Sequence, residues 1–342
     1  MSISKTLLRK LLVVAICAQL TVLLYMAAKR EFIYAYGEEV YLRSAPIDPR
    51  DPFRGDFVRL RYGMNRIVEH RYQGETPIKA IKQGAIIFAV LQEQQDGVFY
   101  ASHFSDIEPE TGLYIKGRIT TKKGYRSSNQ HFVDAKFGIE QYFVQQGRGK
   151  DMEAKLGSRN TLQVPAEMQL ALGSDGTAVL RGHRWSKLGV QVIFERTAAA
   201  PTGETNASEA LSNEAFISPL MTIIFENVSE QPLGFASLAG DCSFSLIASD
   251  PGNHRENIDV GCDASQSQTE TVTILQPGER HSFAIDLDTP RWYFPNEKGE
   301  LVEMAQQNLW LSYRLRYTAP NVDNSWQGFM DTPAFRPTGN ID

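Results

Sequence analysis

The chain has 342 residues, a formal net charge of −5 at pH 7, and 42% hydrophobic residues. A net negative chain has no overall positive field with which to neutralise phosphates, so nucleic acid is excluded as an expected partner. One hydrophobic core rarely organises more than about 250–300 residues, so the length indicates two domains. Valine, isoleucine, tyrosine and phenylalanine recur at alternating positions, which predicts a mainly β protein.

Residues 1–31 contain a basic tip followed by an uninterrupted apolar run at 11–28, with Lys5, Arg9 and Lys10 before it. Eighteen helical residues at about 1.5 Å each nearly cross a hydrocarbon core of roughly 30 Å. Tyr25 and Met26 stand where a cleavage site needs a small residue, so we expect an uncleaved anchor in the lipid bilayer. Basic residues stay cytoplasmic, which places the rest of the chain on the other side of the membrane.

Residues 32–196 are expected to form a β domain. Strand-like runs lie at 39–43, 57–62, 85–91, 98–104, 113–120, 139–144, 177–183 and 189–195. Residues 151–156 and 165–172 are each expected to form one or two helical turns, the second with Pro165 at its first position. Residues 197–214 are rich in Ala, Thr, Ser, Asn and Glu and contain no aromatic residue, which is typical of a linker.

Residues 215–342 contain further strand-like runs at 220–227, 242–249, 271–275, 281–287, 309–318 and 328–335. A Pro-Gly turn joins the third run to the fourth, as in two-sheet sandwiches, and this half resembles an immunoglobulin-like or fibronectin-like sandwich. No Trp lies between Cys242 and Cys262, so the pattern of antibody domains is absent. Arg314 and Arg316 alternate with apolar neighbours, which predicts a strand with one face packed against the core and the other exposed to solvent.

Cys242 and Cys262 both fall in the part of the chain expected outside the cytoplasm. In an oxidising compartment we expect them to form a disulfide, which would stabilise the fold by roughly 3 kcal/mol in the chain-entropy model. Two buried thiols that never meet are the alternative. Cys17 lies in the apolar run and is read as a small membrane residue.

The most distinctive stretch runs Gly55-Asp-Phe-Val-Arg-Leu-Arg-Tyr62, and a second string, Phe137-Gly-Ile-Glu-Gln-Tyr-Phe-Val144, follows it. The first resembles the signature of the GDYXXLXY family, membrane-anchored bacterial proteins named for that string. Gly55, Asp56, Leu60 and Tyr62 match the name, whereas Phe57 replaces its Tyr and loses the hydroxyl. The resemblance covers residues 5–195 and implies a membrane-anchored partner of multi-pass membrane proteins.

Strand alternation places Val58, Leu60 and Tyr62 on one face, which we expect to be core. Phe57, Arg59 and Arg61 point the other way. Together with Arg54, the two strand arginines could form a docking face. Alternatively, they could pair locally with Asp48, Asp51 and Asp56. Those aspartates do not follow the spacing of a calcium loop, and the arginines among them oppose a cation.

The sequence therefore predicts a periplasmic interaction or scaffold protein, anchored by one helix in the bacterial inner membrane, that docks to or stabilises a polytopic membrane partner. No cofactor or metal is expected, because the six histidines show no ligand spacing. Two alternatives stay open. One is a hydrolase with Ser44 as nucleophile and Lys116, Lys122 or Lys123 as base. The other is a protein that binds a small ligand in a cleft between the two domains.

Overall fold

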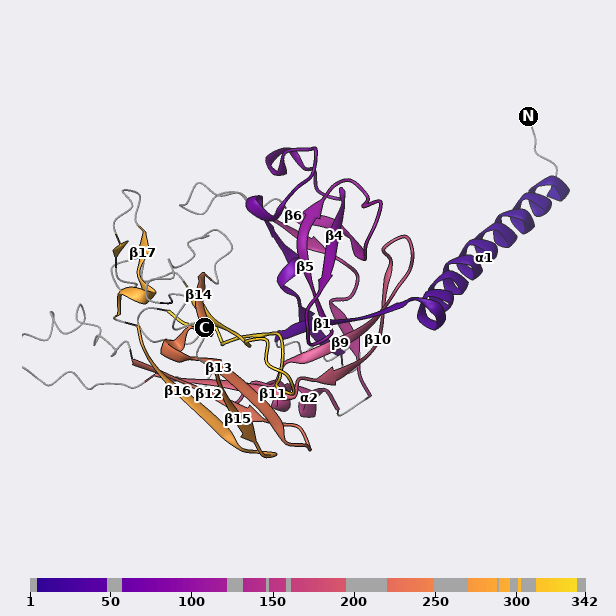
Figure 1. Cartoon of the computed structure of the whole chain (residues 1–342). Helices are drawn as coiled ribbons and strands as arrows, with labels where there is room; N and C mark the ends of the chain where they lie inside the picture. The colour runs from indigo at the N-terminus through magenta and orange to yellow at the C-terminus, as the bar shows by residue number, and fades with distance from the viewer. Residues whose placement is uncertain are drawn as a thin grey trace, which may run out of the picture.

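The computed structural model describes residues 5–47, 57–121, 132–145, 148–157, 161–194, 220–248, 262, 270–287, 289–295, 301–302 and 312–336. A long helix, α1 (Lys5–Tyr36), projects away from a body built mainly of β-strands (Figure 1). Within α1, the segment Arg9–Tyr36 is long and apolar enough to span a membrane, and none of its most apolar window is buried. The prediction of a mainly β fold with one N-terminal apolar helix is confirmed.

The larger sheet has ten strands and holds the N-terminal half together. Its path runs β10-β9-β1-β5-β4-β6-β7-β3, with β2 paired to β1 and β8 paired to β2. The β1–β5 pair is parallel and the other pairs are antiparallel. The elements are β1 (Glu38–Ile47), β2 (Phe57–Arg61), β3 (Arg66–Val68), β4 (Ile86–Glu93), β5 (Val98–Ser105), β6 (Tyr114–Thr121), β7 (Phe132–Lys136), β8 (Gln141–Phe143), β9 (Ala166–Leu172) and β10 (Ala178–Trp185), with helix α2 (Arg148–Leu156) and the short 3-10 helices η1 (Gly63–Asn65), η2 (Glu69–Arg71) and η3 (Ile78–Ala80).

The prediction of a helix at 165–172 is wrong, because Ala166–Leu172 forms strand β9. β9 lies between β1 and β10 and pairs with both over its whole length. Six of its seven side chains are buried, so both faces pack and the local helix preference of Ala, Glu, Met and Leu is overridden. Helix α2 agrees with the other predicted helix.

The C-terminal half contains small sheets packed around one aromatic core. β11 (Leu188–Phe194), β12 (Leu220–Asn227) and β16 (Arg280–Asp286) form one three-stranded sheet, and β14 (Phe244–Ala248), β19 (Tyr313–Thr318) and β20 (Phe329–Asp331) form another. Two-stranded pairs join β13 (Leu233–Leu238) to β15 (Glu270–Leu275) and β17 (Phe294–Pro295) to β18 (Leu301–Val302). The 3-10 helices η4 (Ala239–Asp241) and η5 (Pro290–Trp292) complete the described elements. Phe225 and Tyr317 lie at the centre of the core, with ring centroids 5.0 Å apart.

β11 pairs with β12 from Leu188–Asn227 to Phe194–Met221. β11 lies within residues 32–196, the predicted first domain, but this pairing makes it a strand of the sheet in the C-terminal half. Residues 197–214, which lie outside the described residues, therefore join two strands of one antiparallel pair.

Cys242 and Cys262 form a disulfide, with Cα atoms 5.6 Å apart, as the sequence predicts. The bond connects the chain that follows η4 to a residue twenty positions later. Such a bond restricts the unfolded chain and so favours the folded state.

Candidate functional site

The signature strand β2 lies between β1 and β8, so the two strings singled out in the sequence are neighbours. The side chains of Val58, Leu60 and Tyr62 are at most 3% exposed to solvent, as the alternation predicts. Arg59 and Arg61 are exposed. Phe57 begins β2 and pairs with Phe143. Arg54, Gly55, Asp56, Asp48 and Asp51 lie outside the described residues, so local pairing between these aspartates and the arginines stays a prediction.

Glu140 forms hydrogen bonds within its own segment, residues 137–144, and with residues of the signature region. One carboxylate oxygen, Oε1, accepts hydrogen bonds from the main-chain N–H of Phe137 at 2.6 Å and the side-chain amide of Asn65 at 2.9 Å. The other oxygen accepts from the N–H of Gly138 at 3.0 Å, and the carbonyl of Glu140 accepts from the N–H of Leu60 at 2.9 Å. One residue thus holds the loop before β8 and the register of β2.

Tyr62 closes the signature against the same loop. Its N–H donates to Asn65 Oδ1 at 2.8 Å, and its hydroxyl donates to the carbonyl of Ile139 at 3.2 Å. Burial, and then the charge of Glu140, raise the pKa of Tyr62, so the phenol stays protonated. The signature tyrosine is an internal hydrogen-bond donor.

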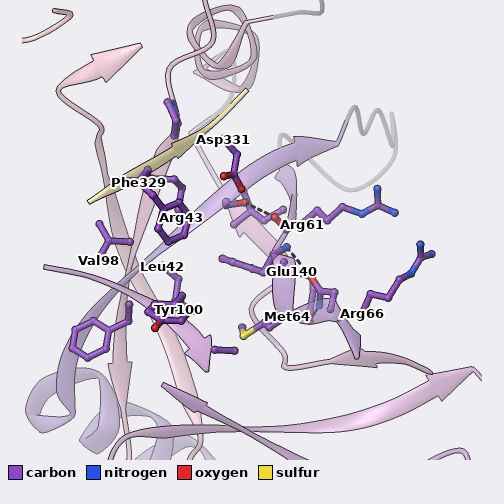
Figure 2. A pocket seen from close by; sticks show the side chains of 18 of the residues that line it. Leu42, Arg43, Arg61, Met64, Arg66, Val98, Tyr100, Glu140, Phe329 and Asp331 are labelled. Carbon is purple, nitrogen blue, oxygen red and sulfur yellow. Dashed lines mark hydrogen bonds between the residues drawn. The ribbon is translucent and has the colours of Figure 1, made fainter. Parts of the chain in front are cut away.

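A cavity of about 1130 Å³ lies between the signature region and the C-terminal half. Figure 2 shows Phe329 and Asp331 of β20 on one side with Arg43, and Met64, Glu140 and Arg66 across the cavity. Basic side chains outnumber acidic ones in this lining. The basic residues are Arg43, Arg59, Arg61, Arg66, Arg71, Lys136, Arg314 and Arg316, and the acidic residues are Asp134, Glu140 and Asp331. The excess of basic residues in the lining contrasts with the net charge of −5 of the whole chain.

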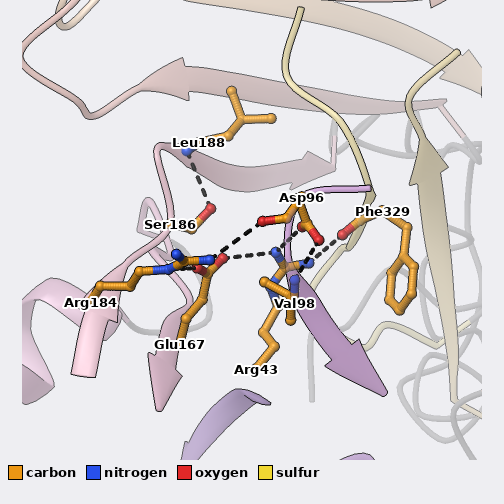
Figure 3. A network of polar contacts seen from close by, with 8 residues as sticks. All are labelled: Arg43, Asp96, Val98, Glu167, Arg184, Ser186, Leu188 and Phe329. Carbon is orange, nitrogen blue, oxygen red and sulfur yellow. Dashed lines mark hydrogen bonds and ion pairs between the residues drawn. The ribbon is translucent and has the colours of Figure 1, made fainter. Parts of the chain in front are cut away.

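Arg43 connects the two halves at the edge of the cavity (Figure 3). Its guanidinium contacts Asp96 at 3.1 Å and Glu167 at 3.0 Å, and it donates to the carbonyl of Phe329 in β20. Arg184 holds the other oxygen of Glu167 at 2.7 Å. Burial raises the pKa of Asp96 even though Arg43 opposes that shift. The network ties β1, β9 and β10 to the C-terminal strand.

Asp331 is the central counter-ion on the other side. Arg316 contacts its two oxygens at 2.6 and 2.9 Å, and the Arg316 guanidinium lies 3.9 Å from the centre of the Phe329 ring. Burial alone would raise the pKa of Asp331, but the charges of Arg316, Arg314 and Arg43 outweigh it and hold the pKa below its ordinary value. One carboxylate thus serves several guanidinium groups.

Arg71 has no such partner among the described residues. Its guanidinium donates to the carbonyl of Ala101 and lies 5.3 Å from the centre of the Phe104 ring. Burial lowers the pKa of Arg71, and repulsion from Arg316 lowers it further. The side chains of Arg59 and Arg61 likewise make no hydrogen bond or ion pair with another described residue. Three of the lining arginines therefore carry charge that no described carboxylate balances.

Ser44 and Lys116, the described candidates for a hydrolase nucleophile and base, each interact with other residues. Ser44 is buried, and its hydroxyl donates to the carbonyl of Arg61 at 3.3 Å. Lys116 extends over the ring of Phe88, 6.0 Å from its centre, whereas Lys122 and Lys123 lie outside the described residues. Within the described ranges, no three His, Cys, Asp or Glu side chains gather as a metal site.

The signature pattern in the sequence indicates Arg59 and Arg61 as site residues, whereas no motif indicates Arg43, Arg71 or Asp331. Strand alternation predicts Arg316 on a solvent-exposed face, whereas in the structure it lines the cavity and pairs with Asp331. The only signal for these residues in the sequence is their type, because an arginine on a strand is consistent with a solvated face as well as with a binding site.

Residues 19–182 match the family model described as GDYXXLXY protein. The match covers a little under half of the chain and ends within β10, where the larger sheet ends. No curated protein and no solved structure matches the chain. The immunoglobulin-like resemblance of residues 215–342 is accordingly not confirmed.

Proposed function

We propose that the protein is a membrane-anchored interaction protein that docks to, or stabilises, a multi-pass partner in the bacterial inner membrane, with its β body in the periplasm. The observation that carries the proposal is the junction between α1 and the larger sheet. A simple tether needs no defined geometry at this point. Here the end of the helix is packed and hydrogen-bonded onto the body.

The junction is built from several contacts. Ile33 is buried in a small cluster with Ala171 of β9 and Val179 of β10. Arg181 of β10 donates to the carbonyl of Tyr34 at 2.6 Å, which holds the last turn of the helix. A β-carbon on Gly37 would lie 2.6 Å from the carbonyl oxygen of Ile33. The close packing between helix and strand therefore leaves no space for a side chain at this position.

These contacts couple the direction of the helix to that of the body. The apolar side chains of α1 between residues 11 and 26 are exposed, which leaves the face of the helix open to other helices in a bilayer. A body held at a fixed angle to its span suits a partner that is itself fixed in the same membrane. The basic residues before the apolar run and the disulfide in the C-terminal half support the periplasmic orientation.

The test is site-specific photo-crosslinking from exposed positions of α1, such as Leu20 or Leu24, in the full chain in native membranes. We expect crosslinks to a protein with several spans, identified by mass spectrometry. A flexible Gly-Ser insertion between Tyr36 and Gly37 keeps the anchor and uncouples the body, so it should lower the yield several-fold. The matched control places the same insertion within 197–214.

Equal crosslinking by the two insertion variants would contradict a role for the rigid junction. Absence of any multi-pass protein among the crosslinks would overturn the docking function itself.

A further inference from the structure

We propose that the arginine-lined cavity between the two halves is a binding site for a small organic anion, one that carries a carboxylate or phosphate group on an apolar portion. The proposal does not depend on the docking function, because it concerns the purified chain alone.

The lining of the cavity carries more positive than negative charge. Asp96 and Glu167 neutralise Arg43 from outside the lining, Asp134 pairs with Arg66 at 3.1 Å, and Asp331 pairs with Arg316. After these pairs are formed, Arg71, Arg59 and Arg61 still face the cavity without a described carboxylate.

Arg71 makes the imbalance costly. It is half-buried and lies near enough to Arg316 for mutual repulsion to shift its titration. A buried charge without a counter-charge destabilises the folded state, and a bound anion would remove that cost. Guanidinium groups are suited to this role, because their planar N–H donors match carboxylate and phosphate oxygens in pairs.

Two buried polar atoms of the lining have no hydrogen-bond partner among the described residues. Gln94 lines the cavity, and its side-chain oxygen is buried without a hydrogen bond. The Nε of Arg43, also in the lining, is buried without one. Buried polar atoms are normally satisfied, and those that are not often mark a place where a ligand or water binds. The Nε of Arg43 is thus available as a donor, and the side-chain oxygen of Gln94 as an acceptor, next to the arginines of the lining.

The cavity also has an apolar part and a size suited to a small molecule. Leu42, Met64, Val98, Tyr100 and Phe329 line the same space (Figure 2). Small-molecule sites typically measure about 300–1000 Å³ and combine apolar walls with a few polar groups. At about 1130 Å³ this cavity is slightly larger than that range, which favours an anion with an apolar body over a bare inorganic ion.

The experiment is isothermal titration calorimetry of the full chain in a neutral detergent. Phenyl phosphate and phthalate are the two anionic probes, inorganic phosphate tests the need for an apolar portion, and benzyl alcohol is the neutral control. We expect saturable binding of phenyl phosphate or phthalate at one site per chain, weaker binding of inorganic phosphate, and none of benzyl alcohol. The better of the two anionic probes identifies the acid group.

Two variants locate the site. Arg71→Gln and the double variant Arg59→Gln with Arg61→Gln should each weaken the better probe about tenfold or more, because each loses charge-assisted hydrogen bonds. Arg280→Gln is the matched control, since Arg280 pairs with Glu226 away from the cavity. The double variant changes only exposed side chains, so it remains informative if Arg71→Gln fails to fold.

No saturable binding of either anionic probe would overturn the proposal. Equal weakening by Arg280→Gln would also overturn it, because it would assign the binding to diffuse surface charge. If a poly-glutamate peptide bound while both small probes did not, the arginines would form a docking surface for an acidic segment instead.

Discussion

Single side chains hold the signature region in place from within. Glu140 accepts hydrogen bonds from three separate N–H donors, and Tyr62 donates its hydroxyl to a main-chain carbonyl next to it. A carboxylate that satisfies several donors at once fixes a loop more firmly than a neutral acceptor does. Leu60 and Tyr62 of the signature therefore have a structural role, and the neighbouring Arg59 and Arg61 are the side chains that point outward.

Replacing Leu60 with Ala tests this division. Leu60 is 2% exposed, and truncation of a buried Leu costs about 2–5 kcal/mol because it leaves a cavity. Arg59→Ala changes an exposed neighbour and should stay within about 0.5 kcal/mol of the parent chain. Chemical denaturation of both variants in neutral detergent measures the difference. Equal stability of the two variants would mean that the signature strand is not part of the core.

The charge of Asp331 predicts a pH dependence of stability. Its folded pKa is depressed, so the ionised carboxylate stabilises the native state fully above the ordinary value of about 4, and that contribution is lost as pH falls through the folded pKa. Between about pH 5 and pH 3, the melting temperature of the parent chain should fall more steeply than that of Asp331→Asn. Parallel curves would show that the ion pair with Arg316 contributes no acid sensitivity.

At the scale of elements, the sequence predicts strands well where one face is buried. β12 is rich in apolar and β-branched residues, which predicts a strand, and its burial alternates from Leu220 to Asn227. The helix prediction for β9 follows the local helix preference of Ala, Glu, Met and Leu, although apolar and polar residues alternate from Ala166 to Leu170. β3 and β7 pair with each other as an edge of the sheet, and their short, mixed sequences carry no such signal.

The disulfide gives a prediction at the same scale. Replacing both Cys242 and Cys262 with Ser removes the constraint on the unfolded chain and should lower stability by roughly 3 kcal/mol. Thermal melts of the double variant and of the parent chain with and without reductant measure this. A melting temperature that reductant does not change in the parent chain would argue that the bond adds no stability.

At the scale of the whole molecule, the two halves are joined by a strand that crosses between them. β11 follows the larger sheet in the chain but pairs with β12 beyond residues 197–214. Arg43 adds a polar connection from β1 to the carbonyl of Phe329. The halves are thus coupled by main-chain hydrogen bonds as well as by the chain between them.

A protease site introduced within 197–214 tests this coupling. After cleavage the two fragments should elute together in size-exclusion chromatography under native conditions, because β11 remains paired with β12. They should separate only in denaturant. Separation in native buffer would show that the covalent connection, and not the sheet, holds the halves together.

The cavity also belongs to this scale, and for that reason the sequence predicts little of it. Arg43, Arg71 and Arg316 come from β1, η2 and β19, and only the completed fold brings them to one space. Arg59 and Arg61 are the exception, because they share one strand face and their proximity follows from alternation alone. Local patterns indicate which residues share a face, and long-range pairing decides which faces meet.

The position of β1 also affects how the protein is made. Glu38–Ser44 pairs with Ala166–Leu172, so the strand directly after the helix lacks its main partner until the chain has been synthesised to Leu172. At about 5–20 residues per second, that delay is on the order of ten seconds. During this delay, the main-chain groups of β1 that later bond to β9 have no partner. β1 directly follows α1, which is already long enough to enter a bilayer. The topology therefore leaves one edge of β1 open to pairing with another chain until β9 has been made.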